Sequence, residues 1–188
     1  MRVVEADVRL FHGRLEVRHL KTVGPVPILW DRWLLANPFR RRLRLADLLA
    51  TVGEDTELLL DVKGLRRRIV TLVRRELASH RGAVVLCARS RRVFDALRAE
   101  PGARVVRSIG SRRQLRSILL RNERLDGVSI HARLLDPAVV ARLRRISDVI
   151  LTWPVRNAEQ ARLLVSWGVD GLITERLELQ TSLAGLAA

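Results

Sequence analysis

The chain has 188 residues, 48% of them hydrophobic, which is enough for one substantial core. No apolar run approaches the ~20 residues of a transmembrane helix. Acidic residues occur too close to the N-terminus for the apolar core of a signal peptide. Its one cysteine, Cys87, excludes an internal disulfide, so we expect a protein of the reducing cytoplasm. The formal net charge is +15, but without tyrosine the chain has little material for stacking bases, so we expect no nucleic-acid partner and interpret its arginines as solvated helix faces.

Seven short segments rich in apolar and β-branched residues recur at regular intervals after a longer first gap. Strands that are apolar on both faces are typical of a parallel sheet covered by helices. Amphipathic segments lie between most of them, which indicates the repeated strand–helix units of an α/β fold. The expected strands are 3–10, 57–63, 83–88, 104–109, 127–130, 148–153 and 171–174.

The segments between these strands carry helix signals. The segment 65–79 places five apolar side chains on one helical face, with arginines opposite. Three later segments are preceded by residues that cap helices. The apolar face comprises Leu65, Ile69, Leu72, Val73 and Leu77, and the capping pairs are Ser111 with Gln114, Asp136 with Pro137, and Asn157 with Gln160.

The segment 11–44 interrupts this regular alternation. It begins with a short β-excursion, RLEVRH, and continues as an expected loop with three prolines, so we interpret it as an insertion after the first strand. No low-complexity linker occurs, which predicts a single domain over 1–188. Seven units without a Gly-rich nucleotide loop after the first strand favour a TIM-type (β/α) barrel over a doubly wound sheet.

Two pairs of charged residues stand near the ends of the first two expected strands. Glu5 and Asp7 are two residues apart, so both side chains point to one face, with Cα atoms about 6.6 Å apart. Two carboxylates turned the same way repel unless a cation or a proton lies between them, and hard oxygen ligands suit Mg²⁺ or Ca²⁺. Asp61 and Lys63 repeat this spacing after three leucines, where unpaired charges are costly. The pairs indicate a site, unless they are solvated strand ends.

Two further residues extend this candidate site. His19 closes the strand that returns from the turn at Phe11 to Gly13, so it can be brought back towards Glu5 and Asp7. Taken alone, it is as consistent with a surface or capping histidine. Trp153 ends the sixth expected strand, where it forms either part of the core or an apolar wall at the barrel mouth.

Three stretches, in this order, resemble one protein family. VEADVRLFHGRLEVRH (4–19) is similar to a Glu-x-Asp strand, a turn and a returning strand that ends in histidine. LADLLATVGEDTELLLDVKG (45–64) is similar to a Leu-rich helix followed by a strand ending in acid-x-Lys, and ILTWPVRNAEQARLLVSWGVDGLITERLE (150–178) to a closing pair of units. Together they resemble the glycerophosphodiester phosphodiesterases from Val4 to about Leu177.

This resemblance implies a divalent cation, Mg²⁺ or Ca²⁺, as the cofactor. Glu5 and Asp7 match two metal-binding carboxylates of the family. Asp61 falls where the third ligand, usually a glutamate, is expected.

The resemblance also implies roles towards the substrate. Lys63 matches the lysine that approaches the phosphate, and His19 matches a general acid that protonates the leaving alcohol. Trp153 matches a tryptophan that packs near the glycerol end of the substrate.

The sequence departs from the family pattern at its start. Family members begin with a strand that ends in His-Arg-Gly, followed by a Pro-Glu-Asn-Thr loop, whereas here Glu5 stands four residues after Met1. We therefore expect a barrel of seven strands, incomplete at the N-terminus, without the first catalytic histidine. The open edges of its first and last strands make self-association possible. Leu20 also replaces the aspartate that follows the second histidine in the family.

The chain has a His-Arg-Gly triplet of its own, at His80 to Gly82. It precedes the expected strand 83–88, whereas chemistry in this fold takes place where strands end. We interpret the triplet as a helix terminus, with His80 and Arg81 complementing the helix dipole and Gly82 at the C′ position.

We therefore predict a metal-dependent phosphodiester hydrolase, an enzyme that converts small glycerophosphodiesters derived from phospholipids into glycerol phosphate and an alcohol. Two alternatives remain. The chain is either a catalytically degenerate member that binds a phosphodiester or a protein partner, or an arginine-rich nucleic-acid binder.

Overall fold

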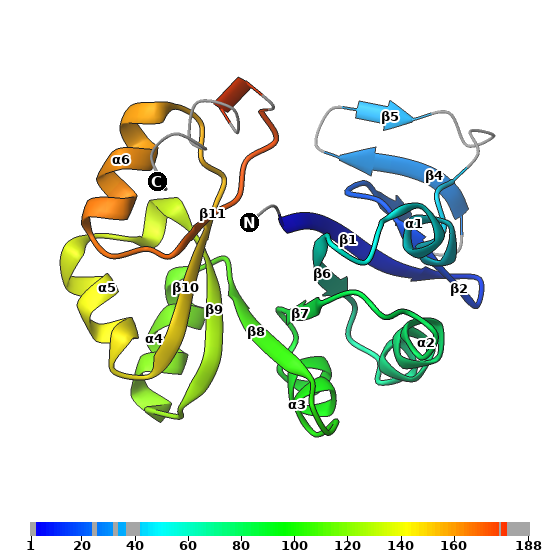
Figure 1. Ribbon diagram of the computed structural model, residues 1–188, viewed down its shortest axis with the longest axis horizontal. Helices are drawn as coiled ribbons and strands as arrows, with labels where there is room; N and C mark the ends of the chain where they lie inside the picture. The colour runs from blue at the N-terminus through cyan, green and yellow to red at the C-terminus, as the bar shows by residue number, and fades with distance from the viewer. Residues whose placement is uncertain (1–2, 24–25, 32–33, 37–41, 177, 180–188) are drawn as a thin grey trace. The chain divides into compact units, whose positions relative to one another are not determined.

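The computed structural model describes residues 3–23, 26–31, 34–36, 42–176 and 178–179. The chain divides into two compact units, Met1–Val105 and Val106–Ala188 (Figure 1). Each of the seven expected strands is present, within two residues of its predicted bounds.

The sheet of the first unit is built around a parallel core. Strand β6 (Glu57–Lys63) pairs in parallel with β1 (Val3–Phe11) on one side and with β7 (Val84–Ala88) on the other. Strand β2 (Arg14–Val17) pairs with β1 in antiparallel fashion. The edge of β1 was expected to be open, but β2 covers its carboxyl-terminal half. The prediction is wrong for this half because it did not count β2, the strand that returns from the turn, as part of the sheet.

A tight turn joins β1 to β2. His12 and Gly13 both have positive φ angles, 45° and 78°, and two such residues at the centre of a hairpin are typical of a type I′ turn. The hairpin continues past β2, because the backbone N–H of Arg18 donates to the carbonyl of Asp7 at 2.9 Å. The next residue, His19, is thereby held beside β1, as the sequence predicted.

The described part of the segment 11–44 holds more regular structure than expected. Beyond β2, strands β3 (Lys21–Val23), β4 (Val26–Asp31) and β5 (Leu34–Ala36) form an antiparallel sheet of their own. The loop predicted there is wrong for these residues. Pro27 lies near the start of the central strand β4, where the pairing with β3 shifts register, and a sheet tolerates proline at such an irregularity. Pro25 and Pro38, which supported the loop prediction, lie outside the described residues.

In the described part of the first unit, the helices are α1 (Leu45–Thr51), α2 (Arg68–Leu77) and α3 (Arg91–Arg98). Helix α2 confirms the helix predicted within 65–79, but it begins three residues later than predicted, at Arg68. Leu65 therefore lies outside the helix and is 76% exposed, so its place on the apolar face was predicted wrongly.

The His-Arg-Gly triplet lies in the connection between α2 and β7, at the start of the strand as predicted. Gly82 is not the C′ residue, because α2 ends at Leu77 and Gly82 does not have a positive φ angle. Its lack of a side chain has another reason: a Cβ atom there would lie 2.7 Å from Nε2 of His80. The triplet is thus a packed connection rather than a helix cap.

The second unit contains four parallel strands in the order β8, β9, β10, β11. Their bounds are β8 (Arg104–Ile109), β9 (Leu125–His131), β10 (Ser147–Trp153) and β11 (Gly171–Leu172). Helices α4 (Arg112–Arg121), α5 (Pro137–Arg144) and α6 (Ala158–Ser166) lie on one side of β9 and β10 (Figure 1), and a short 3-10 helix, Ala132–Leu134, follows β9.

All three predicted helix caps of the second unit are present. In each, a side-chain oxygen accepts a hydrogen bond from a backbone N–H in the first turn, which satisfies one of the donors that a helix start leaves open. The caps are Ser111 with the N–H of Gln114, Asp136 with that of Val139, and Asn157 with that of Gln160.

The two faces of the first sheet differ in character, which places the site. One face is apolar and fully buried, with Val8, Leu60 and Val62 at 1% exposure or less. Because side chains alternate along a strand, the opposite face carries Asp7 and Asp61. Among the described residues, no helix is long and apolar enough to cross a membrane.

Candidate active site

Two aspartates form the centre of the candidate site. Asp7 of β1 and Asp61 of β6 lie directly opposite each other in the parallel register, on the same face of the sheet. Both are buried, at 8% and 7% exposure. Burial raises the pKa of the Asp61 carboxyl, and the neighbouring charge of Asp7 adds to this rise.

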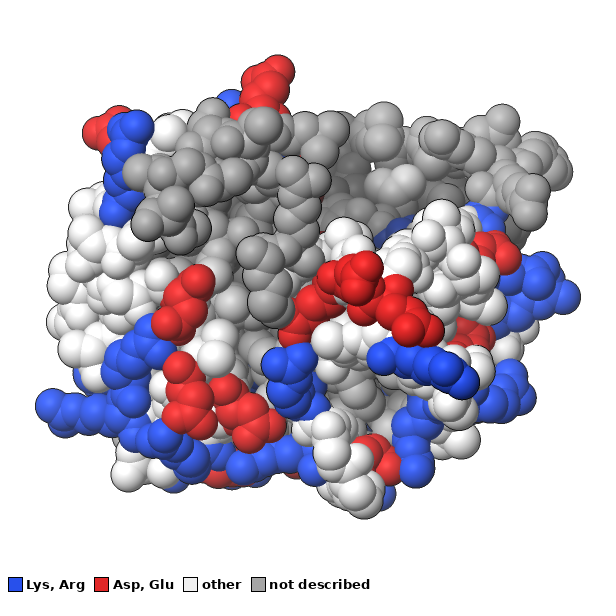
Figure 2. Space-filling view, viewed as in Figure 1, with Lys and Arg blue, Asp and Glu red and all other residues white. Residues whose placement is uncertain are grey.

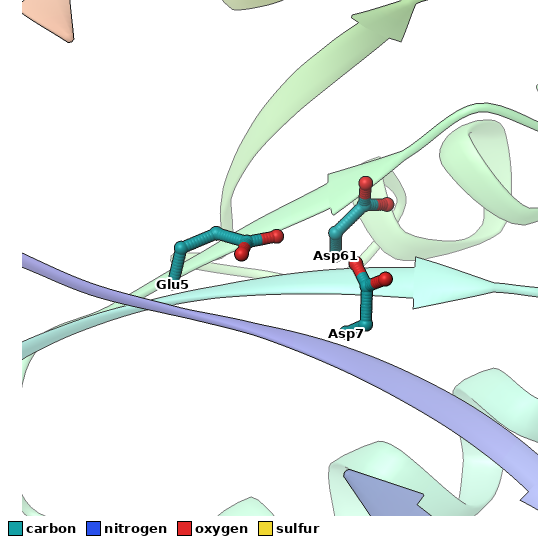
Figure 3. A group of neighbouring side chains, drawn as sticks. All are labelled: Glu5, Asp7 and Asp61. Atoms are coloured by element: carbon teal, nitrogen blue, oxygen red, sulfur yellow. The ribbon is translucent and has the colours of Figure 1, made fainter. Parts of the chain in front are cut away.

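Glu5 completes a group of three carboxylates. It precedes Asp7 by two residues on β1, and one oxygen from each of Glu5, Asp7 and Asp61 lies within 4.8 Å of the others. Figure 3 shows the three carboxylates gathered over β1 and β6. Partial burial of its carboxyl group, followed by the charge of Asp7, raises the pKa of Glu5 to about 7, although the residue as a whole stays accessible to solvent.

Lys63 pairs with both aspartates. Its Nζ lies 3.0 Å from Oδ1 of Asp7 and also donates a hydrogen bond to Oδ2 of Asp61. Burial lowers the pKa of Lys63, but the charges of Asp61 and Asp7 raise it by more, so the net shift is upward. With its three carboxylates ionised and one ammonium, the group has a net charge of −2, which one divalent cation would neutralise.

The donor set fits a hard divalent cation. All three candidate ligands are carboxylates, which Mg²⁺ and Ca²⁺ prefer. In addition, Oδ1 of Asp61 is buried and accepts no hydrogen bond from the described part of the chain. A buried carboxylate oxygen left in this state is costly, and a cation would satisfy it.

His19 reaches the same group from the hairpin. Its Nδ1 lies 3.0 Å from Oδ2 of Asp7, while the side chain is 70% exposed. The carbonyl of His19 accepts a hydrogen bond from Nη2 of Arg9 at 3.3 Å, which ties the end of the hairpin to β1. The imidazole is therefore positioned by a carboxylate on one side and stays accessible to solvent.

Trp153, the sixth predicted site residue, belongs to the second unit, whereas the other five predicted site residues belong to the first. It ends β10 in the second unit, where its ring packs at a tilt against His131 at the end of β9, with centroids 4.8 Å apart. The two residues are opposite each other in the register of these parallel strands. His131 was missed in the sequence, although its position at the end of a strand was the signal to look for.

Two arginines of the first unit were also missed. Arg9 follows Asp7 by two residues on β1 and lies opposite Lys63. Arg89 directly follows β7, and its charge acts on the carboxyl group of Asp61. Counting every second residue along each strand, which identified Glu5 and Asp7, would have identified Arg9 as well.

The structure is similar to several solved phosphodiesterases. A phosphodiesterase from Oleispira antarctica, solved with the product sn-glycerol-3-phosphate, matches 100% of this chain and 86% of its own at 12% identity, with a TM-score of 0.74. A glycerophosphodiester phosphodiesterase from Parabacteroides distasonis matches 98% of this chain and 84% of its own at 17% identity, with a TM-score of 0.73. The chain has the fold of these phosphodiesterases.

The predicted class, a TIM-type (β/α) barrel fold with seven parallel strands, is thereby confirmed. A third structure, a glycerophosphodiester phosphodiesterase from Thermotoga maritima, reaches a TM-score of 0.65 at 20% identity and matches 95% of this chain and 84% of its own. No protein-family model and no curated protein matches the sequence. The resemblance seen in the sequence therefore extends to the fold of the phosphodiesterases.

Both signs of charge occur together on one face of the described surface. On the face shown in Figure 2, lysine and arginine side chains alternate with aspartate and glutamate. Several arginines are engaged in ion pairs, including Arg74 with Glu100 at 2.7 Å and Arg91 with Asp95 at 3.2 Å. These pairs fit the solvated helix surfaces expected from the sequence, and the absence of a nucleic-acid partner stays a prediction.

Proposed function

We propose that this protein belongs to the glycerophosphodiester phosphodiesterases and hydrolyses small glycerophosphodiesters with the help of a divalent cation. The observation that carries the proposal is the grouping of Glu5, Asp7 and Asp61 with Lys63 and His19 within one unit. These are the five positions that the family resemblance assigns to metal binding, phosphate contact and acid catalysis. The fold of solved phosphodiesterases supports the same conclusion.

In this proposal the three carboxylates hold Mg²⁺ or Ca²⁺. When bound, the cation would polarise a phosphoryl oxygen and offset its growing negative charge. Lys63, which already pairs with Asp7 and Asp61, is placed to turn its ammonium towards the phosphate once a cation neutralises the carboxylates.

His19 would supply the proton to the leaving alcohol. Its Nδ1 lies against Asp7, a contact that orients the ring, so Nε2 is the atom left to face the substrate and donate the proton. The substrate's glycerol end would pack near Trp153, as the family resemblance implies.

Turnover of glycerophosphocholine, with and without Mg²⁺ or Ca²⁺, tests the proposal. We expect cation-dependent release of choline, and a loss of about 10²- to 10⁴-fold in kcat for His19→Ala, the range for one acid–base group. Asp61→Asn should weaken cation binding measured by calorimetry. Turnover that is indifferent to the cation, or unchanged in His19→Ala, would refute the assignment.

A second candidate function is binding without catalysis. The observation that favours it is the 70% exposure of the His19 side chain, since a general acid usually works where water is excluded. Cation binding by the wild-type chain without hydrolysis of glycerophosphocholine would select this function over the first.

A further inference from the structure

A row of cationic residues follows the carboxylates at the carboxyl end of the first sheet. In the register of β1 with β6, the pair Asp7–Asp61 is followed two residues later by the pair Arg9–Lys63. Side chains two residues apart point to the same face, about 6.6 Å further along the strand. Arg9 and Lys63 therefore lie on the face of the carboxylates, one step nearer the end of the barrel where active sites of this fold are found.

Arg89 extends this row immediately beyond the end of the third strand, β7. Cys87 of β7 lies opposite Asp61 in the register of β6 with β7, and Arg89 follows it by two residues. Its guanidinium is close enough to favour the ionised form of Asp61, which opposes the effect of burial on that carboxyl's pKa. The residue is exposed, so its guanidinium can reach a ligand at this edge of the sheet.

The charges of the carboxylates and of the cationic row balance as long as no cation is bound. With Glu5 ionised, the carboxylates contribute −3 and Arg9, Lys63 and Arg89 contribute +3, so the group is then close to neutral. A bound divalent cation brings the sum to +2. This value suits a ligand of one or two negative charges, which is the charge of a phosphate diester or monoester.

We propose that Arg9 and Arg89, on either side of Lys63, bind the anionic oxygens of the phosphate ligand, with Arg89 as the principal contact. A planar guanidinium offers two parallel N–H donors to a phosphate, which an ammonium does not. The identity of the ligand as a phosphate ester rests on the proposed function. The contact itself rests on the register of β1 with β6 for Arg9, and for Arg89 on its exposed position directly after β7, two residues beyond the partner of Asp61.

The test uses the full chain with saturating Mg²⁺ and calorimetric titration of sn-glycerol 3-phosphate. We expect Arg89→Gln to weaken its binding by about tenfold or more, in the range for loss of a hydrogen bond to a charged group. Arg89→Lys should fall between the wild type and Arg89→Gln. Arg81→Gln is the matched control, because Arg81 is also an exposed arginine but precedes β7, whereas Arg89 follows it. The loss of Arg81 should leave the affinity for sn-glycerol 3-phosphate unchanged.

A second titration separates ligand contact from damage to the fold. Removing the positive charge of Arg89 beside Asp61 should leave Mg²⁺ affinity unchanged or increase it, whereas a disturbed sheet would weaken both ligands. Phosphate binding within twofold of the wild type in Arg89→Gln, or an equal loss of Mg²⁺ and phosphate binding, would overturn the proposal.

The outcome is independent of the proposed hydrolysis. Loss of phosphate binding in Arg89→Gln supports the cationic row even if the wild type shows no turnover of glycerophosphocholine. Conversely, if Arg89→Gln turns over substrate with an unchanged KM, the hydrolase assignment stands and the proposed phosphate contact of Arg89 is refuted.

Discussion

Lys63 is expected to stabilise the first unit as well as to contact a ligand. It is the cation that pairs with both Asp7 and Asp61, which are buried at 8% and 7% exposure. Lys63→Met leaves the two buried carboxylates facing each other without the one ammonium that pairs with both. Breaking a buried pair costs roughly 3–5 kcal/mol. Because the Lys63 side chain is itself 21% exposed, we expect the lower end of that range, about 3 kcal/mol.

Chemical denaturation at pH 8 in the presence of a chelator measures this loss as a lower free energy of unfolding. Mg²⁺ at about 100 times its Kd should return about 2.7 kcal/mol, because the cation binds only the folded chain. The difference from the wild type should also shrink as the pH falls. Burial raises the pKa of Asp61, so the penalty exists above its folded pKa and disappears once the carboxyls are protonated in both states.

The control is Arg81→Met, the loss of a cation at an exposed position of the same unit. Its free energy of unfolding should stay within about 0.5 kcal/mol of the wild type. If Lys63→Met loses no more than this control in the chelator, Lys63 does not compensate the aspartates and the reasoning fails.

Three further predictions concern other groups of the first unit. Mg²⁺ affinity should rise with pH up to about 7, by at most about tenfold per unit, because a proton must leave Glu5; calorimetry at pH 6 and 8 should show this dependence in the wild type and not in Glu5→Gln. Gly82→Ala should lower the free energy of unfolding by about 1 kcal/mol, since its Cβ would press on His80, whereas Gly53→Ala, with no atom within 4 Å, should not. Gly13→Ala should cost about 1 kcal/mol through its φ of +78° alone; a melting temperature equal to the wild type would contradict the turn geometry.

Local chemistry explains which parts of the fold were predictable from the sequence. The caps at Ser111, Asp136 and Asn157 are formed by side chains and N–H groups a few residues away, so the sequence contains both partners. The strands were found because strands buried on both faces need continuous apolar runs. Strands β3 to β5 were missed because the three prolines of this segment were taken as the signal of a loop, although β4 and β5 are mostly apolar. The single domain over 1–188 and the cytoplasmic location stay predictions.

The candidate site was predictable in its members more than in its geometry. Period-two spacing placed Glu5 with Asp7 and Asp61 with Lys63, and the hairpin turn brought His19 back. Spacing within one strand says nothing about the register between two strands. That register, which sets Asp7 opposite Asp61, depends on how the strands pack and could not be predicted from the sequence.

Two arginines beside β7 show why position decides function in a chain with so many basic residues. Arg81 belongs to a His-Arg-Gly triplet whose letters match a catalytic motif, yet it stands at the start of the strand, where Gly82 is needed to clear His80. Arg89 matches no motif, but it stands where the strand ends, two residues beyond the partner of Asp61. Because Arg89 follows the residue paired with Asp61 by two positions and Arg81 precedes that residue by six, a ligand bound beside Asp61 can meet Arg89 and not Arg81. Arg89→Gln and Arg81→Gln should therefore differ, although each removes one positive charge from the same unit.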